Sequence, residues 1–165
     1  MKRLLLVGFI LLSFVQITAA QEAKNINEIL SDKLCDRLCA AAREKSKELG
    51  IDICFAIADR HGLPRVYRRY GDALVLSITL VPGKAYTAAV TQCKTKDVAA
   101  AAAEGAPLMS IQTNDSRITL VAGGYPLFVD GKIVGAIGVG GGTEAQDCEI
   151  AEYVIEVFKK LSKQS

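Results

Sequence analysis

This chain of 165 residues carries little net charge and only one histidine. Its 20 basic residues nearly balance 18 acidic ones, which leaves a formal net charge of +2 at pH 7. A domain that binds nucleic acid normally carries a strongly basic surface, so this balance excludes nucleic acid as a partner. The chain has one histidine, with no paired acid at a suitable spacing, which argues against a nucleophile–base–acid triad.

Long apolar runs occur only at the amino terminus, although hydrophobic residues make up 50% of the chain. The basic start Met1-Lys2-Arg3 is followed by the apolar run 4–15 and then by the small residues Thr18-Ala19-Ala20. This order is typical of a secretory signal peptide, and the run is shorter than the roughly 20 residues of a membrane span. We therefore expect residues 1–20 to be a cleaved signal, with a retained membrane anchor as the alternative. Residues 21–165 would then form one secreted or periplasmic domain of zero net charge.

The five cysteines cannot all pair within one chain because their number is odd. They are Cys35, Cys39, Cys54, Cys93 and Cys148. Cys35 and Cys39 lie four residues apart on an expected helix, so both thiols face one side. They could form half of a soft-metal site or a redox pair, or they could pack as small buried residues. The sequence favours packing, because a closed zinc site needs four ligands and no second Cys/His pair has the right spacing.

Hydrophobic periodicity predicts helices and strands through the first two thirds of the domain. The capping box Asn25/Glu28 predicts a helix start, and Gly50 predicts its end. Residues 74–81 fit either a helix or a strand, and Pro82-Gly83 is expected to interrupt that segment. The other expected elements are a buried strand at 51–59, a turn at 60–64, a more polar strand at 65–70, and helices at 84–92 and 95–104.

The last third of the chain has stronger turn signals. Asp130-Gly131 predicts a tight hairpin, and Thr143 with Gln146 predicts the capped start of a final helix. The strands expected here are 117–122, 127–129 and 132–139, with a turn at 123–126. Tight hairpins between end helices favour a single-domain α+β fold, with an antiparallel sheet and flanking N- and C-terminal helices on one face.

A run of glycines lies between the last expected strand and the last expected helix. Gly140, Gly141, Gly142 and Thr143 could present backbone N–H groups to a phosphate or carboxylate at the helix N-terminus. The run fits neither the phosphate-binding G-x-x-x-x-G-K-[ST] pattern nor the dinucleotide-binding G-x-G-x-x-G pattern. The alternative is that these glycines serve close packing and positive φ in a tight turn.

A basic hairpin with interleaved tyrosines is a second candidate site. A period of two places Arg65, Tyr67 and Arg69 on one face of the expected strand. Cationic and aromatic groups on one face suit a planar anionic ligand, and His61 in the turn could ligate iron, as imidazole and phenolate both do in haem proteins. The alternative is a solvated strand face with a turn histidine.

The polar segment 113–117 precedes the expected strand at 117–122. Thr113, Asn114 and Arg117 could converge there on a ligand. Asn and Asp also favour such turns through side-chain hydrogen bonds to nearby backbone, so the segment is explained equally well without a ligand.

Several strings in this order resemble the GlcG/HbpS family, which includes the C-terminal domain of PduO-type proteins and is often labelled as haem-binding or haem-degrading. The strings are Gly83-Lys84-Ala85-Tyr86-Thr87-Ala88-Ala89, Thr113-Asn114-Asp115, Gly123-Gly124-Tyr125-Pro126-Leu127, Val134-Gly135-Ala136-Ile137-Gly138-Val139, and Gly141-Gly142-Thr143 with Gln146-Asp147. The resemblance covers roughly residues 30–160. It implies a profilin-like fold, assembly into higher oligomers, and binding of haem or a related tetrapyrrole.

Together, the signal peptide and the resemblance predict an exported haem-binding protein that acts in sequestration or sensing. Cobalamin or another tetrapyrrole is a less favoured ligand, and a membrane sensor is an expected partner beside self-association into a homo-oligomer. We expect His61 or a tyrosine to ligate iron. We expect the haem propionates to contact Arg65, Lys84 or Arg117. The alternatives are an enzyme that degrades haem or acts on a small carboxylic acid, and a structural oligomer with no ligand.

Overall fold

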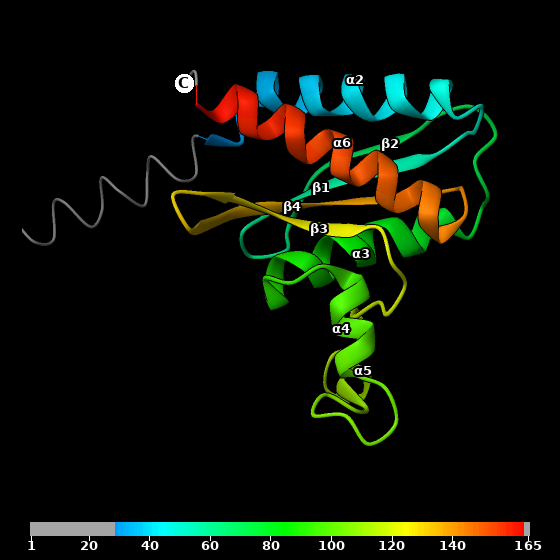
Figure 1. The fold of residues 1–165 in the computed structure, drawn as a ribbon, viewed down its shortest axis with the longest axis vertical. Helices are drawn as coiled ribbons and strands as arrows, with labels where there is room; N and C mark the ends of the chain where they lie inside the picture. The colour runs from blue at the N-terminus through cyan, green and yellow to red at the C-terminus, as the bar shows by residue number, and fades with distance from the viewer. Residues whose placement is uncertain (1–28, 164–165) are drawn as a thin grey trace, which may run out of the picture.

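A four-stranded antiparallel sheet forms the centre of the structure (Figure 1). The computed structural model describes residues 29–163, so the signal predicted at residues 1–20 and the cap predicted at Asn25 lie outside the described residues. The strands are β1 (Cys54–Asp59), β2 (Pro64–Arg69), β3 (Gly124–Val129) and β4 (Lys132–Gly140), in the spatial order β2-β1-β4-β3. The helices are α2 (Asp32–Glu48), α3 (Ser77–Thr91), α4 (Thr95–Ala101), α5 (Ile111–Asn114) and α6 (Glu144–Ser162). This confirms the predicted single-domain α+β, profilin-like fold.

Helices cover both faces of the sheet, whereas the sequence analysis placed them on one face. Figure 1 shows α2 and α6 on one side and α3 on the other. The physical reason is that β1 and β4 are apolar on both faces, so each face needs a cover. Phe55 and Ile137 join the core under α2 and α6. Ala56 and Ala136 belong to the clusters on the α3 side, where the buried side chains are small.

Helix α3 lies unusually close to the sheet because glycines face it. A Cβ atom added to Gly138 would overlap the carbonyl oxygen of Val81 and lie 2.9 Å from the nitrogen of Ala85. One added to Gly124 would overlap the carbonyl oxygen of Lys84. Backbone therefore meets backbone across this interface, which only glycine permits.

The interruption predicted at Pro82 is wrong, because α3 runs through this residue from Ser77 to Thr91. Proline in a helix interior costs about 3 kcal/mol, since it removes one backbone hydrogen bond and crowds the preceding turn. Val81 and Ala85 are nearly inaccessible against the sheet, and Ala88 is fully buried. Packing along this face offsets the local cost of Pro82.

Three predicted element ends that depend on local hydrogen bonds or dihedral angles are confirmed, whereas β3 begins at Gly124 inside the predicted turn 123–126 and α4 ends at Ala101 instead of 104. Gly50 follows α2 with φ +67°, and Asp130 and Gly131 both have positive φ in the hairpin. Thr143 and Gln146 form the predicted capping box of α6. The described start of α2 differs from the prediction, because Ser31 is the cap and accepts a hydrogen bond from the Leu34 N–H.

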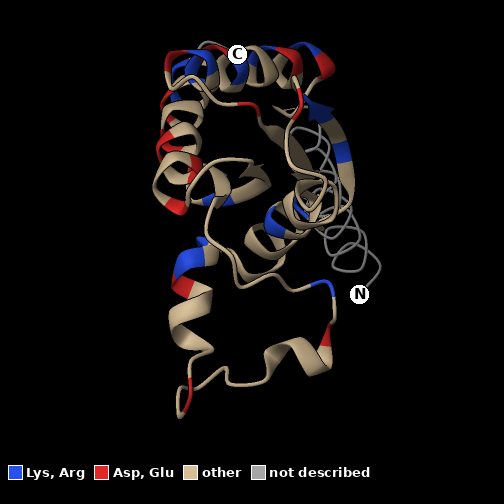
Figure 2. Ribbon diagram, turned by 90° about the vertical axis from the view of Figure 1, so that its right-hand side faces the viewer, with Lys and Arg blue, Asp and Glu red and all other residues tan. Residues whose placement is uncertain are grey.

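The strand predicted at 117–122 is wrong, and this segment is irregular in the structure. Its backbone bonds to a helix side chain instead of a neighbouring strand, as the Thr119 N–H donates to Thr87 Oγ1 at 2.8 Å. Preceding it, an arm of residues 99–117 extends away from the sheet (Figures 1 and 2). None of the arm's side chains is buried. The arm includes α5, which the sequence analysis treated as a turn.

We predict that Gly138→Ala destabilises the protein by about 3 kcal/mol, because the new methyl group must push α3 away from β4. Gly105→Ala is the matched control: Gly105 has φ +74° with open space around it, so this change should cost only about 1 kcal/mol of backbone strain. Urea unfolding of both variants measures the difference. Equal losses would contradict the close packing of α3.

Candidate functional site

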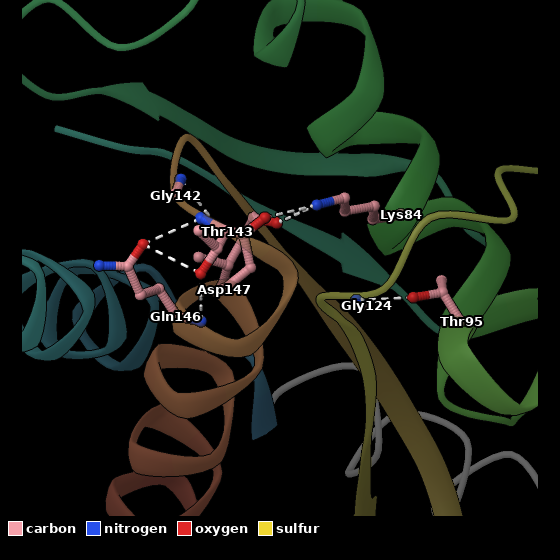
Figure 3. Close-up of polar contacts among 8 residues, drawn as sticks. Lys84, Thr95, Gly124, Gly142, Thr143, Gln146 and Asp147 are labelled. Carbon is pink, nitrogen blue, oxygen red and sulfur yellow. Dashed lines mark hydrogen bonds and ion pairs between the residues drawn. The ribbon is translucent and has the colours of Figure 1, made fainter. Parts of the chain in front are cut away.

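A buried ion pair joins α3 to the start of α6 (Figure 3). Lys84 Nζ lies 2.8 Å from Asp147 Oδ2 and donates to the Val139 carbonyl oxygen at 2.7 Å. Lys84 is only 2% exposed. Burial raises the pKa of Asp147 above its usual range, although the Lys84 charge and the Gly142 N–H oppose this. Lys84, which was expected to meet a propionate, is thus engaged inside the protein.

The glycine run before α6 is held by contacts within the chain. The Gly142 N–H donates to Asp147 Oδ1 at 3.1 Å, and the Thr143 N–H donates to Gln146 Oε1 at 2.9 Å (Figure 3). Gly141 has φ +138°, and a Cβ atom on it would overlap the Asp52 carbonyl oxygen. Packing and capping account for these residues, and a carboxylate site at Gly140–Thr143 stays a prediction.

Arg65 and Tyr67 lie on opposite faces of the sheet, although a period of two predicted that they share one face. Strand pairing passes from Ile57–Val66 to Ala58–Pro64, so Arg65 is the extra residue of a β-bulge. Arg65 Nη2 donates to the Leu30 carbonyl oxygen at 3.0 Å, on the α2 side of the sheet.

Tyr67 lies on the α3 side, opposite Ala56, and its hydroxyl donates to Cys54 Sγ at 3.0 Å. Burial, the bond to Cys54 and the neighbouring thiol raise the pKa of Tyr67 to about 12, which keeps the phenol neutral. Tyrosine ligates haem iron through its phenolate, and the raised pKa makes the Tyr67 phenolate harder to form than that of an exposed tyrosine.

The histidine turn, residues 59–63, rests against α3. Asp59 Oδ1 accepts hydrogen bonds from the N–H groups of His61 at 2.8 Å and Leu63 at 2.9 Å. A Cβ atom added to Gly62 would lie 2.5 Å from Tyr86 Cδ2, so the turn touches the Tyr86 ring. His61 is exposed, and its Nε2 accepts a hydrogen bond from Arg60 Nε at 3.0 Å.

On α3, Tyr86 belongs to a second group that we call the Tyr86 cluster: Tyr86, Asp115 and Arg117. The Tyr86 hydroxyl donates to Asp115 Oδ2 at 2.5 Å. Arg117 Nε and Nη2 donate to the two oxygens of Asp115 at 2.9 and 2.8 Å. The guanidinium carbon of Arg117 lies 4.2 Å from the Tyr86 ring centroid. The hydrogen bonds from Arg117 and Tyr86 hold the pKa of Asp115 well below its usual range.

The structure therefore brings the histidine turn and Arg117 to one surface through Tyr86. Sequence reasoning noted Tyr86 and Asp115 only as parts of longer motifs and assigned no site role to either. Their contact joins residues 29 positions apart, which no local pattern predicts. Thr113 and Asn114 are exposed at the end of α5, directly before Asp115, and Thr113 Oγ1 donates to the Ser110 carbonyl oxygen.

A groove lies elsewhere, between the edge strand β3 and α6. It consists of two adjoining hollows of about 230 and 520 Å³ that share Lys94, Tyr125, Ile155 and Lys159. Lys94 Nζ lies 4.7 Å from the Tyr125 ring centroid. None of the residues predicted as a ligand site lines this groove.

All five cysteines are free thiols, and Cys35 and Cys39 lie on the buried face of α2, in the core. Burial raises the pKa of Cys35 to about 11, so this thiol stays protonated near neutral pH. Across residues 29–163, no group of three or more His, Cys, Asp or Glu side chains is arranged to hold a metal ion. Cys35 and Cys39 pack among apolar side chains of the core, as the packing interpretation predicts. Within the same residues, no helix is long and apolar enough to cross a membrane.

Comparison with known proteins shows which family shares this fold and these motifs. A family model described as "Haem degrading protein HbpS-like" matches residues 30–156. An uncharacterized 15.0 kDa protein from the dhaT-dhaS intergenic region of Citrobacter freundii is 35% identical over 126 residues, 76% of this chain and 89% of that protein. The corrinoid adenosyltransferase PduO of Salmonella typhimurium is 33% identical over 120 residues, 72% of this chain. That match covers 36% of PduO, so this chain spans about a third of that enzyme's length.

The crystal structure of a PduOC:heme complex superposes with a TM-score of 0.74 at 33% identity, and the match covers 77% of this chain and 93% of that one. This superposition and the four-stranded antiparallel sheet show that the chain is an α+β domain of the PduO-type fold. The chain belongs to the HbpS-like family, which confirms the resemblance drawn from the sequence.

We predict that Lys84→Met costs about 3–5 kcal/mol of stability, because it leaves the Asp147 carboxylate buried without its cation. Asp147→Asn should also destabilise, since it leaves the Lys84 ammonium unpaired. The double variant should lose clearly less than the sum of the two single losses. A double-mutant cycle from urea unfolding measures this coupling, and additive losses would contradict it.

Proposed function

We propose that this chain binds haem at the surface formed by the histidine turn and the Tyr86 cluster. The observation that carries the proposal is the position of His61, an exposed imidazole on a turn that packs against Tyr86. Membership of the HbpS-like family supports it, as does the likeness to a PduO domain solved with haem.

The residues around His61 suit the three chemical parts of a haem. The iron takes a nitrogen ligand, for which His61 is the only imidazole in the chain. The apolar ring needs apolar contacts, and two exposed apolar side chains lie near Gly62: Leu63 follows it in the turn, and Val90 packs beside it from α3. The propionates need a cation, and the Arg117 side chain is 65% exposed beside Tyr86. Ligation through Nε2 requires Arg60 to release its hydrogen bond to His61.

We further propose that the protein is exported and acts in haem sequestration or sensing, with a membrane sensor as the partner in a sensing role. The signal-like residues 1–20 support export. Cobalamin is the second tetrapyrrole to test, because the matched PduO protein is a corrinoid adenosyltransferase. The second candidate function is haem degradation, which the description of the family model favours.

We predict that haemin titrated into the reduced full-length chain gives a saturable Soret shift with one haem per subunit. The dissociation constant should be near 1 μM, equivalent to about −8 kcal/mol. His61→Ala should weaken binding about tenfold and alter the Soret position, because the iron loses its ligand. Cobalamin titrated in parallel should bind more weakly.

Lys33→Ala is the control for that titration, since Lys33 is exposed on α2, across the sheet from the proposed surface. Only weak, non-saturating uptake would overturn haem binding. Full binding by His61→Ala with an unchanged spectrum would remove His61 as the ligand. Loss of the Soret band after a reductant and oxygen are added, with release of iron, would favour the degrading enzyme.

Self-association is also part of this proposal, because the start of α3 carries an uncovered apolar patch. Leu74, Val75, Leu76 and Ile78 are all exposed, and Val75 is 74% exposed. Clusters of this kind on a soluble protein are usually covered by another protein surface, and a symmetric homo-oligomer places the same patch on each copy against its partner.

We predict that Val75→Glu shifts the protein to a smaller species in size-exclusion chromatography with light scattering, because a charge in an apolar interface is costly to desolvate. Ala40→Glu introduces the same charge at an exposed position on α2, across the sheet, and should leave the mass unchanged. A monomeric wild-type chain would overturn self-association. An oligomer that Val75→Glu does not alter would show that another surface forms the contact.

A further inference from the structure

We propose that Arg117 is the residue that selects ligands with free carboxylate groups, and that Asp115 is the positioning residue that aims it. This inference rests on the proposed haem-binding function and names the chemical feature of the tetrapyrrole that the site recognises. It predicts a preference for porphyrins with ionised side chains over the same porphyrins with esterified ones.

Three basic residues were predicted to contact the propionates. Of these, Arg117 is the one that the structure leaves available on this surface. Lys84 is buried and bonded to Asp147 and the Val139 carbonyl oxygen. Arg65 is bonded to the Leu30 carbonyl oxygen on the opposite side of the sheet. Arg117 stacks on the Tyr86 ring, which also contacts the histidine turn.

The hydrogen bonds of Arg117 leave one edge of its guanidinium group for a ligand. Arginine has five N–H donors, and Asp115 takes one on Nε and one on Nη2. The donors on Nη1 and the second donor on Nη2 form the other edge. That edge has the spacing to bind a carboxylate through two parallel hydrogen bonds.

Asp115 fixes the direction of this edge. Its carboxylate bonds the Arg117 side chain, accepts from the Arg117 backbone N–H at 3.0 Å and accepts from the Tyr86 hydroxyl. Stacking on the ring at 4.2 Å removes a further degree of freedom. A guanidinium group held in this way loses less conformational entropy when a ligand binds.

The charge of Asp115 also influences which anion suits the site. A carboxylate bonded to Arg117 repels a doubly charged phosphate more than a singly charged carboxylate. Removing that charge would strengthen the attraction of Arg117 for every anion while loosening its orientation. Affinity for haemin alone therefore does not reveal the role of Asp115, whereas the preference for the acid over the ester does.

The test compares haemin with haemin dimethyl ester, each titrated into the full-length chain under the same detergent conditions. The wild type should bind haemin about tenfold more tightly than the ester, because the ester lacks the charged oxygens that pair with Arg117. Arg117→Gln and Asp115→Asn should each reduce this ratio to about twofold or less. Arg117→Lys keeps the charge without the planar fork, so it should retain only part of the preference.

Matched variants separate positioning from a general effect on folding or charge. Asp72→Asn removes the acid of another exposed Asp–Arg pair, Arg69–Asp72, and should leave the ratio unchanged. Asp115→Glu keeps a carboxylate and should restore part of the ratio that Asp115→Asn loses. Thermal melts establish that each variant is folded before it is titrated.

Each outcome decides one part of the inference. Equal wild-type affinity for haemin and its ester would overturn selection by Arg117 while leaving haem binding intact. No saturable binding of either compound would overturn the proposed function itself. A full acid-over-ester preference in folded Asp115→Asn would overturn the positioning role of Asp115 and leave that of Arg117 standing.

Discussion

The close approach of α3 to the sheet is the constraint on which the rest of this structure depends. It requires glycine at Gly124 and Gly138 and small side chains along β1, so that helix backbone can lie against strand backbone. At this distance the Lys84 side chain reaches the β4 carbonyl of Val139 and the Asp147 carboxylate without leaving the interior. A larger residue on the sheet would therefore separate the helix from the strand and break the buried ion pair that joins three elements.

The same constraint decides which charged residues can meet a ligand. Because α3 covers one sheet face, side chains on that face are either small and buried or lie at its margins, where Tyr67 and the histidine turn are found. Because of the bulge at Arg65, that guanidinium group lies on the other side of the sheet. There it donates to the Leu30 carbonyl oxygen, just before α2. Arg117 reaches the α3 side as the last residue of the arm, and its guanidinium group stacks on the Tyr86 ring there.

The parts of the fold that could be predicted from the sequence are those set by neighbouring residues. Gly50, the Asp130-Gly131 hairpin and the Thr143/Gln146 cap all depend on bonds or dihedral angles within a few positions. Pro82 misled the prediction because its local cost is outweighed by packing against strands far away in the sequence. The segment 117–122 has the apolar composition of a strand, but Thr87 takes one of its backbone hydrogen bonds. Tyr86 and Asp115 were missed for the same reason, since their contact exists only once α3 and the arm are in place.

Helix α3 also links the two surfaces proposed to bind partners. Its first turns follow the apolar patch at Leu74–Leu76, and its later turns carry Tyr86 and Val90 beside the histidine turn. The arm 99–117, none of whose side chains is buried, leaves α4 and returns to this helix through the Asp115–Tyr86 hydrogen bond. A ligand that binds Arg117 would therefore also restrain the end of the arm, which by itself buries no side chain. Since the patch adjoins the start of this helix and includes Ile78 within it, ligand binding and subunit association both involve α3, and linkage requires that any influence of one on the other be reciprocal.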